Sequence, residues 1–553
     1  MSLYKRIAAL VLSMGFPYSA IASEIRFTDF TRESGIDFKM ICGRMPSREI
    51  LEVNGGGVAL FDFDKDGDLD VFFANGATMD APEQGPGSRL YANRGNGTFE
   101  DVTAKAGIDV KRWAMGIAIG DVDSDGWDDI YVTCFGQDVL LRNAGADGTG
   151  RFVDMTEKAG IRDNRWSSSA AFGDLDLDGD LDLYVANYLA FDPKNLPDRA
   201  GKTFKGVPVM AGPSGLAPEM DILYENVGGG RFRDITREAG IVENTPGYGL
   251  GVRMFDYDND GKLDIFVGND STENYLFHNL GKLKFEELGV QAGVAANYEG
   301  TTQATMGIAL GDVDGNGAPD LFSTNFSSDT NTLHLNLGDG FFDDRTAQFG
   351  LGIVSRPFLS WGCGFYDFDL DGDEDLFTAS GHVYPETATH QMDTEWGQNV
   401  SMYERKEKRF ERVTDCGEMF TKKFHGRSVA FGDIDNDGDV DIVMTTLNGP
   451  VHVFRNDAPK RERLAVELVG PRGNPRAYGS RVELVAPTGT QRRWITGGGS
   501  YQSADAPHAY FGLGGAKPDG SVKIKVTFFD GKTVEKSVDR TTGRLSIHYP
   551  AKE

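Results

Sequence analysis

A nine-residue acidic segment with the pattern D-x-D-x-[DN]-G-x-x-D occurs seven times in this chain. The copies span residues 62–70, 121–129, 174–182, 256–264, 312–320, 367–375 and 433–441. Positions 1, 3 and 9 are always Asp, position 6 is always Gly, and position 5 is Asp except for Asn316 in the fifth copy. Position 7 varies among Asp, Trp, Lys and Ala, so a backbone carbonyl is expected to act there rather than a side chain.

Carboxylates at alternate positions of a tight loop match the ligands of Ca²⁺, which takes about six to eight oxygen atoms. Glycine at position 6 permits the sharp turn that brings position 9 back toward the ion. A single such loop would fit a solvated turn equally well, but seven copies that keep the ligand positions favour metal binding. The sequence therefore predicts up to seven Ca²⁺ sites, of which the Asn316 site is expected to be the weakest.

The predicted metal ligands include position 7, which would contribute its carbonyl oxygen. They are Asp62, Asp64, Asp66, Asp68, Asp70, Asp121, Asp123, Asp125, Trp127, Asp129, Asp174, Asp176, Asp178, Asp180, Asp182, Asp256, Asp258, Asp260, Lys262, Asp264, Asp312, Asp314, Asn316, Ala318, Asp320, Asp367, Asp369, Asp371, Asp373, Asp375, Asp433, Asp435, Asp437, Asp439 and Asp441. An EF-hand is excluded, because it needs a Glu at position 12 and flanking helices. Position 12 is Phe73 in the first copy and Val132 in the second, within apolar runs typical of strands.

The acidic segments begin 59, 53, 82, 56, 55 and 66 residues apart, a period typical of propellers and solenoids. In each unit a short apolar run precedes the loop and a second one follows it. A third run has a Leu-x-x-Asn signature in the first five units, and a Gly-rich turn then leads to a fourth run of the type Phe-x-Asp-x-Thr. Four short strands per unit predict a propeller blade.

The two ends of the repeat array predict a closed ring. The seventh unit ends after residues 451–456 and has no Phe-x-Asp-x-Thr strand, whereas such a strand stands alone at residues 27–31, before the first loop. Pairing these two ends would complete the last blade and remove exposed sheet edges. We therefore predict an all-β fold: a seven-bladed β-propeller with calcium-binding hairpin loops, followed by a small β-sandwich-like domain.

The blades resemble FG-GAP/VCBS repeats, which are familiar from integrin-α propellers, and the whole arrangement is similar to the cartilage acidic protein family and its bacterial relatives. Residues 474, 479–482, 497–501, 511–514 and 529–531 resemble the ASPIC/UnbV domain. The resemblance implies calcium held by the loop aspartates, an extracytoplasmic location and a binding rather than a catalytic role. The expected organisation is a signal peptide at 1–22, the propeller at 23–457 and an ASPIC/UnbV-like β domain at 461–550.

The first residues fit a secretory signal, because Lys5 and Arg6 precede an apolar run that ends near Phe16 and a small-residue cleavage site follows at Ala20-Ile21-Ala22. The alternative is a retained N-terminal anchor. No later run is long and apolar enough for a membrane span. We expect an exported protein that is periplasmic, cell-surface or secreted.

The formal net charge of −28 is unevenly distributed. Residues 461–553 contain 15 Lys plus Arg against 9 Asp plus Glu, so the propeller carries the acidic excess, including 27 loop carboxylates at positions 1, 3, 5 and 9. Without cations these carboxylates would repel one another. An acidic propeller disfavours nucleic acid as a partner. The basic C-terminal segment could dock on it, although the alternation in residues 522–526 also fits a solvated strand face.

Four cysteines show no metal or redox spacing. Cys42 and Cys416 both follow a predicted fourth strand and are candidates for a disulfide, which export would permit. Cys134 and Cys363 lie in strand-like runs and are expected to be buried thiols.

Two long insertions, residues 187–221 and 380–400, join second and third strands and should lie on the face opposite the acidic loops. Long loops on a rigid scaffold commonly carry recognition residues. The candidate ligand-binding residues are Tyr188, His382, Tyr384 and Trp396, for an unidentified protein or carbohydrate; alternatively they anchor their own loops. Two other functions remain open: a calcium-dependent polysaccharide lyase with a base at residues 381–384, and a purely structural matrix component.

Overall fold

The computed structural model describes residues 23–145, 150–241, 246–486, 489–514, 522–538 and 543–550. The predicted signal peptide at 1–22 lies outside these residues. Within them, no helix is long and apolar enough to cross a lipid bilayer.

Seven sheets of the described chain each contain four antiparallel strands that follow the predicted order of the repeat unit. The strands that precede the acidic loops are β2 (Val58–Phe61), β6 (Trp113–Gly120), β10 (Ser167–Gly173), β16 (Gly249–Phe255), β20 (Ile308–Gly311), β24 (Ser360–Tyr366) and β28 (Gly426–Gly432). Those that follow the loops are β3 (Asp70–Phe73), β7 (Asp129–Phe135), β11 (Asp182–Asn187), β17 (Asp264–Asn269), β21 (Asp320–Ser323), β25 (Asp375–Ser380) and β29 (Asp441–Thr446).

The outer half of each sheet contains the two signature strands. The third strands are β4 (Arg89–Asn93), β8 (Val139–Asn143), β14 (Ile222–Asn226), β18 (Tyr275–Asn279), β22 (Thr332–Asn336), β26 (Ser401–Lys406) and β30 (His452–Asn456). The fourth strands are β5 (Phe99–Asp101), β9 (Phe152–Asp154), β15 (Phe232–Asp234), β19 (Phe285–Glu287), β23 (Phe342–Asp344), β27 (Arg409–Val413) and, from the N-terminal end, β1 (Phe27–Asp29).

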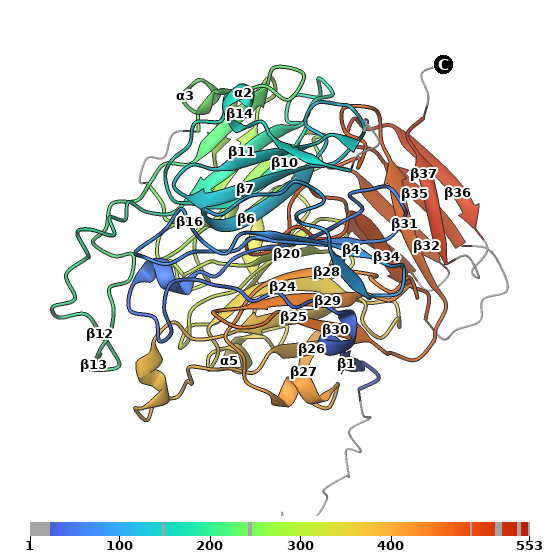
Figure 1. The fold of residues 1–553 in the computed structure, drawn as a ribbon. Helices are drawn as coiled ribbons and strands as arrows, with labels where there is room; N and C mark the ends of the chain where they lie inside the picture. Colours follow the sequence, from blue (N-terminus) through green and yellow to red (C-terminus); the bar gives the residue numbers. More distant parts are fainter. Residues whose placement is uncertain are drawn as a thin grey trace, which may run out of the picture.

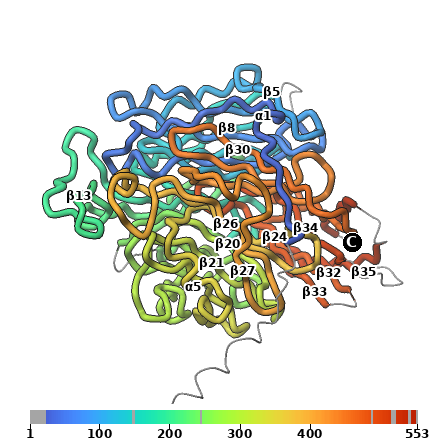
Figure 2. The backbone as a smooth tube through the Cα atoms, turned by 90° about the horizontal axis from the view of Figure 1, so that it is seen from below, coloured from blue at the N-terminus to red at the C-terminus, as the bar shows by residue number. Residues whose placement is uncertain are grey.

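The innermost strands form a closed ring, because each contacts the innermost strand of the next sheet and β28 contacts β2. The N-terminal strand β1 pairs with β30, with Phe27 opposite Asn456, and completes the last sheet (Figure 2). This pairing leaves no gap between the first and last repeats, as the isolated Phe-x-Asp-x-Thr strand at residues 27–31 indicated. The chain is a β-propeller.

Short helices connect the sheets. The α-helices are α1 (Thr31–Ser34), α2 (Thr156–Ala159), α3 (Thr236–Ala239), α4 (Gly289–Ala292) and α5 (Gly352–Ser355), and the 3-10 helices are η1 (Ile50–Val53), η3 (Pro385–Ala388) and η4 (Glu418–Thr421). The first four α-helices each follow a fourth strand and end at a glycine in the left-handed conformation. Only glycine adopts this conformation without a steric cost, which explains the Gly that recurs after most fourth strands.

The C-terminal segment forms a two-layered β-sandwich, as predicted. One sheet has the order β34 (His508–Gly512), β31 (Arg463–Val469), β37 (Arg544–His548), and the other has the order β33 (Gly489–Trp494), β32 (Arg481–Ala486), β35 (Val522–Thr527), β36 (Thr533–Val538). Apolar side chains of both sheets, among them Val466, Phe511, Leu484 and Ile524, pack in one buried cluster. Alternate residues of β35 face this core, and Lys523 and Lys525 of the same strand pair with Glu535 and Glu483.

The sandwich covers the face of the propeller that carries the acidic loops (Figure 1). From it, residues 496–506 enter the centre of the ring and bond to the innermost strands. The amides of Leu60 and Ile117 donate to the carbonyls of Ala504 (3.0 Å) and Gln502 (3.2 Å). A Cβ at Gly57 would lie 1.9 Å from the Gln502 carbonyl oxygen, so glycine is required for this close approach. The propeller and the sandwich therefore share a core.

The predicted disulfide between Cys42 and Cys416 is wrong, because both residues are free thiols. Cys42 packs in the apolar cluster near the ring axis with Trp113 and Trp166, whereas Cys416 packs with Phe27 and Met419 at the closure of the last sheet. Position after a fourth strand therefore did not bring the two cysteines together. Cys134 and Cys363 are buried thiols, as expected.

Tyr501 at the tip of the inserted segment offers a test of the shared core. Its side chain is 0% exposed and lies 5.0 Å from the Trp361 ring. We expect Tyr501→Ala to lower the free energy of unfolding by about 3 to 5 kcal/mol through the cavity that it leaves, measured by urea denaturation. Tyr298→Ala, at a tyrosine that is 84% exposed, should change it little. Equal effects of the two substitutions would contradict the shared core.

Candidate metal centres

The seven acidic loops share one backbone conformation. Position 6 glycine has a positive φ in every loop, from 86° at Gly261 to 110° at Gly372. Position 4 is also left-handed in every loop, although it is a glycine only at Gly315; in the first loop it is Lys65, with φ 61°. The need for glycine at position 6 was predicted correctly. The second left-handed residue was not, because its side-chain type varies from loop to loop.

The position 1 carboxylate organises the turn. In the first loop Asp62 accepts hydrogen bonds from the amides of Asp66 (3.2 Å) and Gly67 (3.0 Å). The same pair of bonds recurs in the second loop, where Asp121 accepts from Asp125 and Gly126. Each bond draws the position 1 carboxylate toward the interior of the loop.

The position 9 aspartate ties the loop to the rest of its blade. One oxygen of Asp70 accepts the amide of Phe63 at position 2 (3.0 Å), and the other accepts the amide of Asn93 at the end of the third strand (2.8 Å). The equivalent pair of bonds is present in all seven loops. Position 9 is thus a structural acceptor as well as a predicted ligand.

The signature asparagine explains why the third strand ends as it does. Its side-chain amide donates to a position 2 carbonyl in the acidic loop of the preceding blade, as Asn226 Nδ2 does to Val122 O (2.8 Å) and Asn93 Nδ2 does to Ile434 O (2.7 Å). The latter bond joins the first blade to the last. In the sixth blade Arg405 occupies this position, and its backbone amide donates to Asp375 as the asparagine amides do to position 9 in the other blades. The sequence showed the asparagine as a repeat signature, but it did not predict that the side chain would form a hydrogen bond to the neighbouring blade.

The loops gather carboxylate oxygens tightly enough to hold metal ions. Ligand atoms of Asp62, Asp64 and Asp66 lie within 4.8 Å of one another, and the third loop has a trio at the same positions 1, 3 and 5. In the second and fourth loops the clustered trio is at positions 1, 3 and 9. Both Asp174 oxygens are buried without a hydrogen-bond partner in the described structure, and one oxygen each of Asp123 and Asp433 is in the same state. A buried carboxylate oxygen without a partner is costly unless a cation meets it. The donor sets therefore fit a hard cation.

Burial dominates the electrostatics of these loops. It raises the pKa of Asp121, Asp174 and Asp256 to about 7, and neighbouring loop aspartates raise it further. Burial also raises the pKa of Asp70 to about 9, although the two hydrogen bonds that it accepts from backbone amides lower it. Without a bound cation, burial therefore favours the protonated form of these four aspartates.

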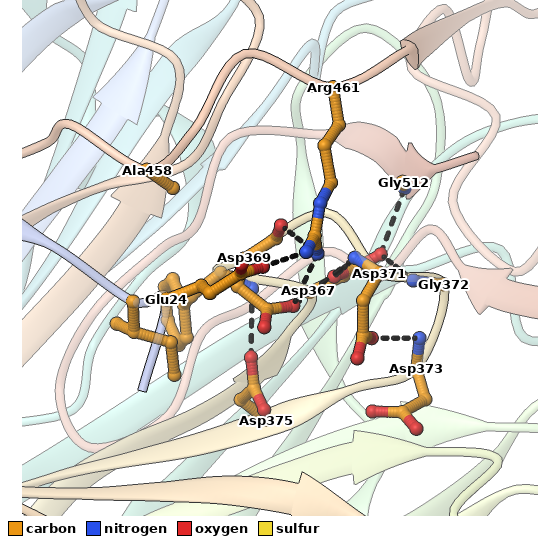
Figure 3. A network of polar contacts seen from close by, with 12 residues as sticks. Glu24, Asp367, Asp369, Asp371, Gly372, Asp373, Asp375, Ala458, Arg461 and Gly512 are labelled. Atoms are coloured by element: carbon orange, nitrogen blue, oxygen red, sulfur yellow. Dashed lines mark hydrogen bonds and ion pairs between the residues drawn. The ribbon is translucent and has the colours of Figure 1, made fainter. Parts of the chain in front are cut away.

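Cationic side chains of the C-terminal region also reach the loops. Arg492 Nη1 lies 2.8 Å from an Asp312 oxygen in the fifth loop, and Arg476 pairs with Asp128 in the second. In the sixth loop the guanidinium of Arg461 donates to the Asp369 carbonyl (2.7 Å), and the amide of Gly512 donates to Asp367 (3.0 Å), as Figure 3 shows. The prediction that the basic segment docks on the acidic face is therefore confirmed. Arginines make the contacts, rather than the lysines of β35.

His278 next to the fourth loop was not predicted, and Lys262 was predicted only for its carbonyl oxygen at position 7, not for its side chain. His278 Nδ1 lies 3.2 Å from Asp264 and 3.7 Å from Asp258 in the fourth loop, and this ion pair raises the pKa of the imidazole. Lys262 at position 7 pairs with Asp260 in the same loop. His278 could have been predicted from the sequence, because it directly precedes the signature asparagine Asn279 and the ends of the third strands lie beside the acidic loops.

The four predicted ligand-binding residues lie on the opposite face, but they are not equivalent. Tyr188 and Tyr384 line one hollow. His382 is 0% exposed behind them, with Nε2 2.9 Å from Ser327 Oγ and Nδ1 accepting the Tyr384 amide. Trp396 does not line the hollow and packs on His425, with 4.7 Å between ring centroids.

The two insertions meet on this face. The first contains a hairpin of β12 (Thr203–Phe204) and β13 (Val207–Pro208), which Figure 1 shows far from the C-terminal sandwich. Phe204 packs on His382 and Tyr384, at 5.3 Å and 5.4 Å between ring centroids, and Lys205 pairs with Asp393 of the second insertion. The two insertions therefore form one surface around the ring axis.

Family models match both parts of the chain. The model for FG-GAP-like repeats matches residues 62–132, 121–185, 211–267, 256–323 and 312–378, and the model for ASPIC and UnbV matches residues 470–553. These matches confirm the resemblance on which the repeat and C-terminal assignments were based.

Full-length relatives cover nearly the whole chain. It is 26% identical to cartilage acidic protein 1 of Mus musculus over an alignment of 535 residues that covers 90% of this chain and 74% of the relative. The Homo sapiens protein of the same name is 25% identical and is covered to 72%. A solved Agrocybe aegerita lectin that recognises non-reducing terminal N-acetylglucosamine is similar at a TM-score of 0.38 and 15% identity, covering 73% of this chain and 94% of its own.

The raised pKa values predict how pH affects the metal-free protein. Since the pKa of Asp121, Asp174, Asp256 and Asp433 is about 7 in the folded state, above the ordinary value near 3.8, the folded protein binds protons more tightly than the unfolded chain. Stability should therefore fall as pH rises from about 5 to about 8. The measurement is the melting temperature of chelator-dialysed protein across this range. A melting temperature that rises steadily would contradict the assignment.

Proposed function

The chain belongs to the FG-GAP-like repeat family and ends in an ASPIC and UnbV domain, and from this premise we propose that it is an exported calcium-binding β-propeller that captures a protein or glycan ligand. The observation that supports this proposal best is the set of buried, unpartnered carboxylate oxygens in the loops, exemplified by both oxygens of Asp174. Calcium serves the fold, and the opposite face serves recognition.

Calcium is the ion that suits these donors. All predicted side-chain ligands are carboxylate or amide oxygens, and position 7 adds a backbone carbonyl, a set typical of Ca²⁺. Soft transition metals would need Cys or His ligands. His278 adjoins the fourth loop, but the other loops offer oxygen donors alone among the predicted ligands. We propose up to seven ions, with the positions named from the sequence as ligands.

Export is proposed from the signal-like residues 1–22 and from the calcium sites, because extracellular calcium modules commonly bind at about 10⁻⁴ to 10⁻³ M. The relatives carry the name cartilage acidic protein. At millimolar calcium outside the cytosol such weak sites would be filled, whereas cytosolic calcium would leave them empty. Proposed locations are the periplasm, the cell surface or the medium.

The recognition face is proposed from the two insertions that meet around Tyr188 and Tyr384. The acidic loop face is occupied by the sandwich, so the insertion face is the one left for a large partner. Aromatic side chains at the centre of such a face suit a protein or carbohydrate ligand.

The lyase alternative has no comparable support. A lyase base must reach the substrate proton, but His382 is fully buried and both of its nitrogens are engaged within the protein. Burial lowers its pKa to about 3, which keeps the imidazole neutral. His382 fits a role in fixing the conformation of the second insertion.

Calcium binding predicts a matched pair of substitutions in the first loop. Asp64→Ala removes a proposed ligand at position 3, whereas Asp68→Ala removes the same charge at position 7, where the carbonyl is the proposed ligand. A site filled at ten times its Kd adds about 1.4 kcal/mol of stability. We expect the increase in melting temperature on adding calcium to be smaller in Asp64→Ala than in Asp68→Ala, as measured by differential scanning calorimetry. Absence of any calcium effect in the unaltered protein would contradict the proposal.

Ligand capture tests the recognition face. We expect the calcium-loaded protein to retain a partner from periplasmic or cell-surface extracts, and a variant with residues 190–217 and 385–395 replaced by short Gly-Ser linkers to lose it. Retained proteins and glycans would be identified by mass spectrometry. The matched control is Arg472→Ala on the sandwich side, which should leave capture unchanged. Capture that survives removal of both insertions would place the site elsewhere.

A further inference from the structure

A small hollow of about 50 Å³ lies at the centre of the insertion face. Its wall includes Tyr188 after β11, Asp270 after β17, Phe326 after β21, and Trp361 at the start of β24. Each of these positions is at the end of a strand away from the acidic loops. Tyr384 of the second insertion completes the aromatic part of the wall.

Asp270 is the one acidic or basic side chain on this wall. It accepts hydrogen bonds from the Tyr188 hydroxyl (2.6 Å) and the Ser271 hydroxyl (2.8 Å). Among the described residues, only these two hydroxyl groups and burial influence the pKa of Asp270, and no Lys, Arg or His contributes. Desolvation raises its pKa. A carboxylate in such surroundings without a cationic partner is stabilised when a ligand brings one.

The neighbouring rings favour a cation of organic character. Tyr188, Phe326, Trp361 and Tyr384 all line one small space, and the Phe326 and Tyr384 ring centroids are 5.9 Å apart. Ring faces attract ammonium groups, and the attraction strengthens as the cation is removed from water. A hydrated metal ion would gain little from these apolar walls, whereas alkyl groups on an ammonium would bury against them.

A hydrogen-bond donor is also available. Asn54 lines the hollow and is 3% exposed, and its Nδ2 has no acceptor among the described residues. A buried amide without a partner costs free energy that a ligand oxygen can recover. An acceptor atom on the ligand, near the ammonium, would therefore add to binding.

We propose that the hollow binds a compact organic ammonium group, held by the Asp270 carboxylate and the surrounding aromatic rings. The inference rests on the proposed function, because Tyr188 and Tyr384 belong to the insertions of the recognition face. It specifies which chemical group of the ligand this face would bind. The carboxylate at Asp270 disfavours anions by charge repulsion. Arg427 stacks on the Trp361 ring at 4.3 Å to the centroid but lies outside the lining of the hollow.

The experiment compares choline with 3,3-dimethylbutan-1-ol, which has the same shape without the charge. Isothermal titration calorimetry on the full chain in excess calcium should show choline binding and at least tenfold weaker binding of the neutral analogue. Asp270→Asn keeps an acceptor for the Tyr188 hydroxyl and should weaken choline binding by about tenfold to a hundredfold. Asp192→Asn is the matched control, since it removes the same charge from an exposed position of the first insertion.

A second variant keeps the test informative if Asp270→Asn fails to fold. Tyr384→Leu removes one aromatic wall but keeps apolar bulk, and it should reduce choline binding more than binding of the neutral analogue. Equal binding of both probes, or unchanged choline affinity in Asp270→Asn, would overturn the proposal. Because these titrations need no partner, capture of a ligand from extracts together with absent choline binding would refute the ammonium site while leaving the recognition face intact.

Discussion

Clustered aspartates on seven hairpins are the constraint on which the rest of this structure depends. The loops gather carboxylates at alternate positions close together, and burial partly removes the position 1 carboxylates, such as Asp121 and Asp174, from water. The position 9 aspartate also anchors the third strand through its amide hydrogen bonds. The same side chains that define a blade therefore create a charge cluster that the fold alone does not neutralise. The proposed calcium ions would neutralise this charge at each loop.

The C-terminal sandwich also places positive charge next to the acidic loops. Its arginines reach the acidic face at several loops, and its inserted segment fills the centre of the ring. A propeller axis that would otherwise be open is thereby closed from one side by Tyr501. The opposite end of the axis keeps the hollow with Asp270 on its wall. The proposed recognition face is accordingly separated from the acidic loops by the thickness of the propeller.

Sequence repetition predicted most of the fold because each repeat encodes the same local physics. The loop pattern, the four strands per unit and the pairing of residues 27–29 with the last sheet could all be read from comparison among the copies. Contacts between distant segments could not be predicted in this way. The insertion of residues 496–506 into the ring and the separation of Cys42 from Cys416 depend on tertiary packing, for which the chain contains no repeated pattern.

The candidate sites divide along the same line. The spacing of the seven copies indicated the aspartate clusters that the structure shows in the first four loops, whereas it gave no indication of His278, which is unique to one blade. On the insertion face, the sequence indicates ligand-binding residues only by their aromatic or imidazole character. The structure separates Trp396 from Tyr188 and Tyr384. The sequence did not indicate Asp270 as a ligand-binding residue, because nothing in its local sequence distinguishes it from other residues at strand ends.

The most direct test of the central claim is the calcium content of the protein at equilibrium. After dialysis against millimolar calcium, elemental analysis by mass spectrometry should find several ions per chain, up to seven, and none should remain after dialysis against a chelator. A folded chain that holds less than one calcium ion under the first condition would show that the aspartate clusters are neutralised by other means.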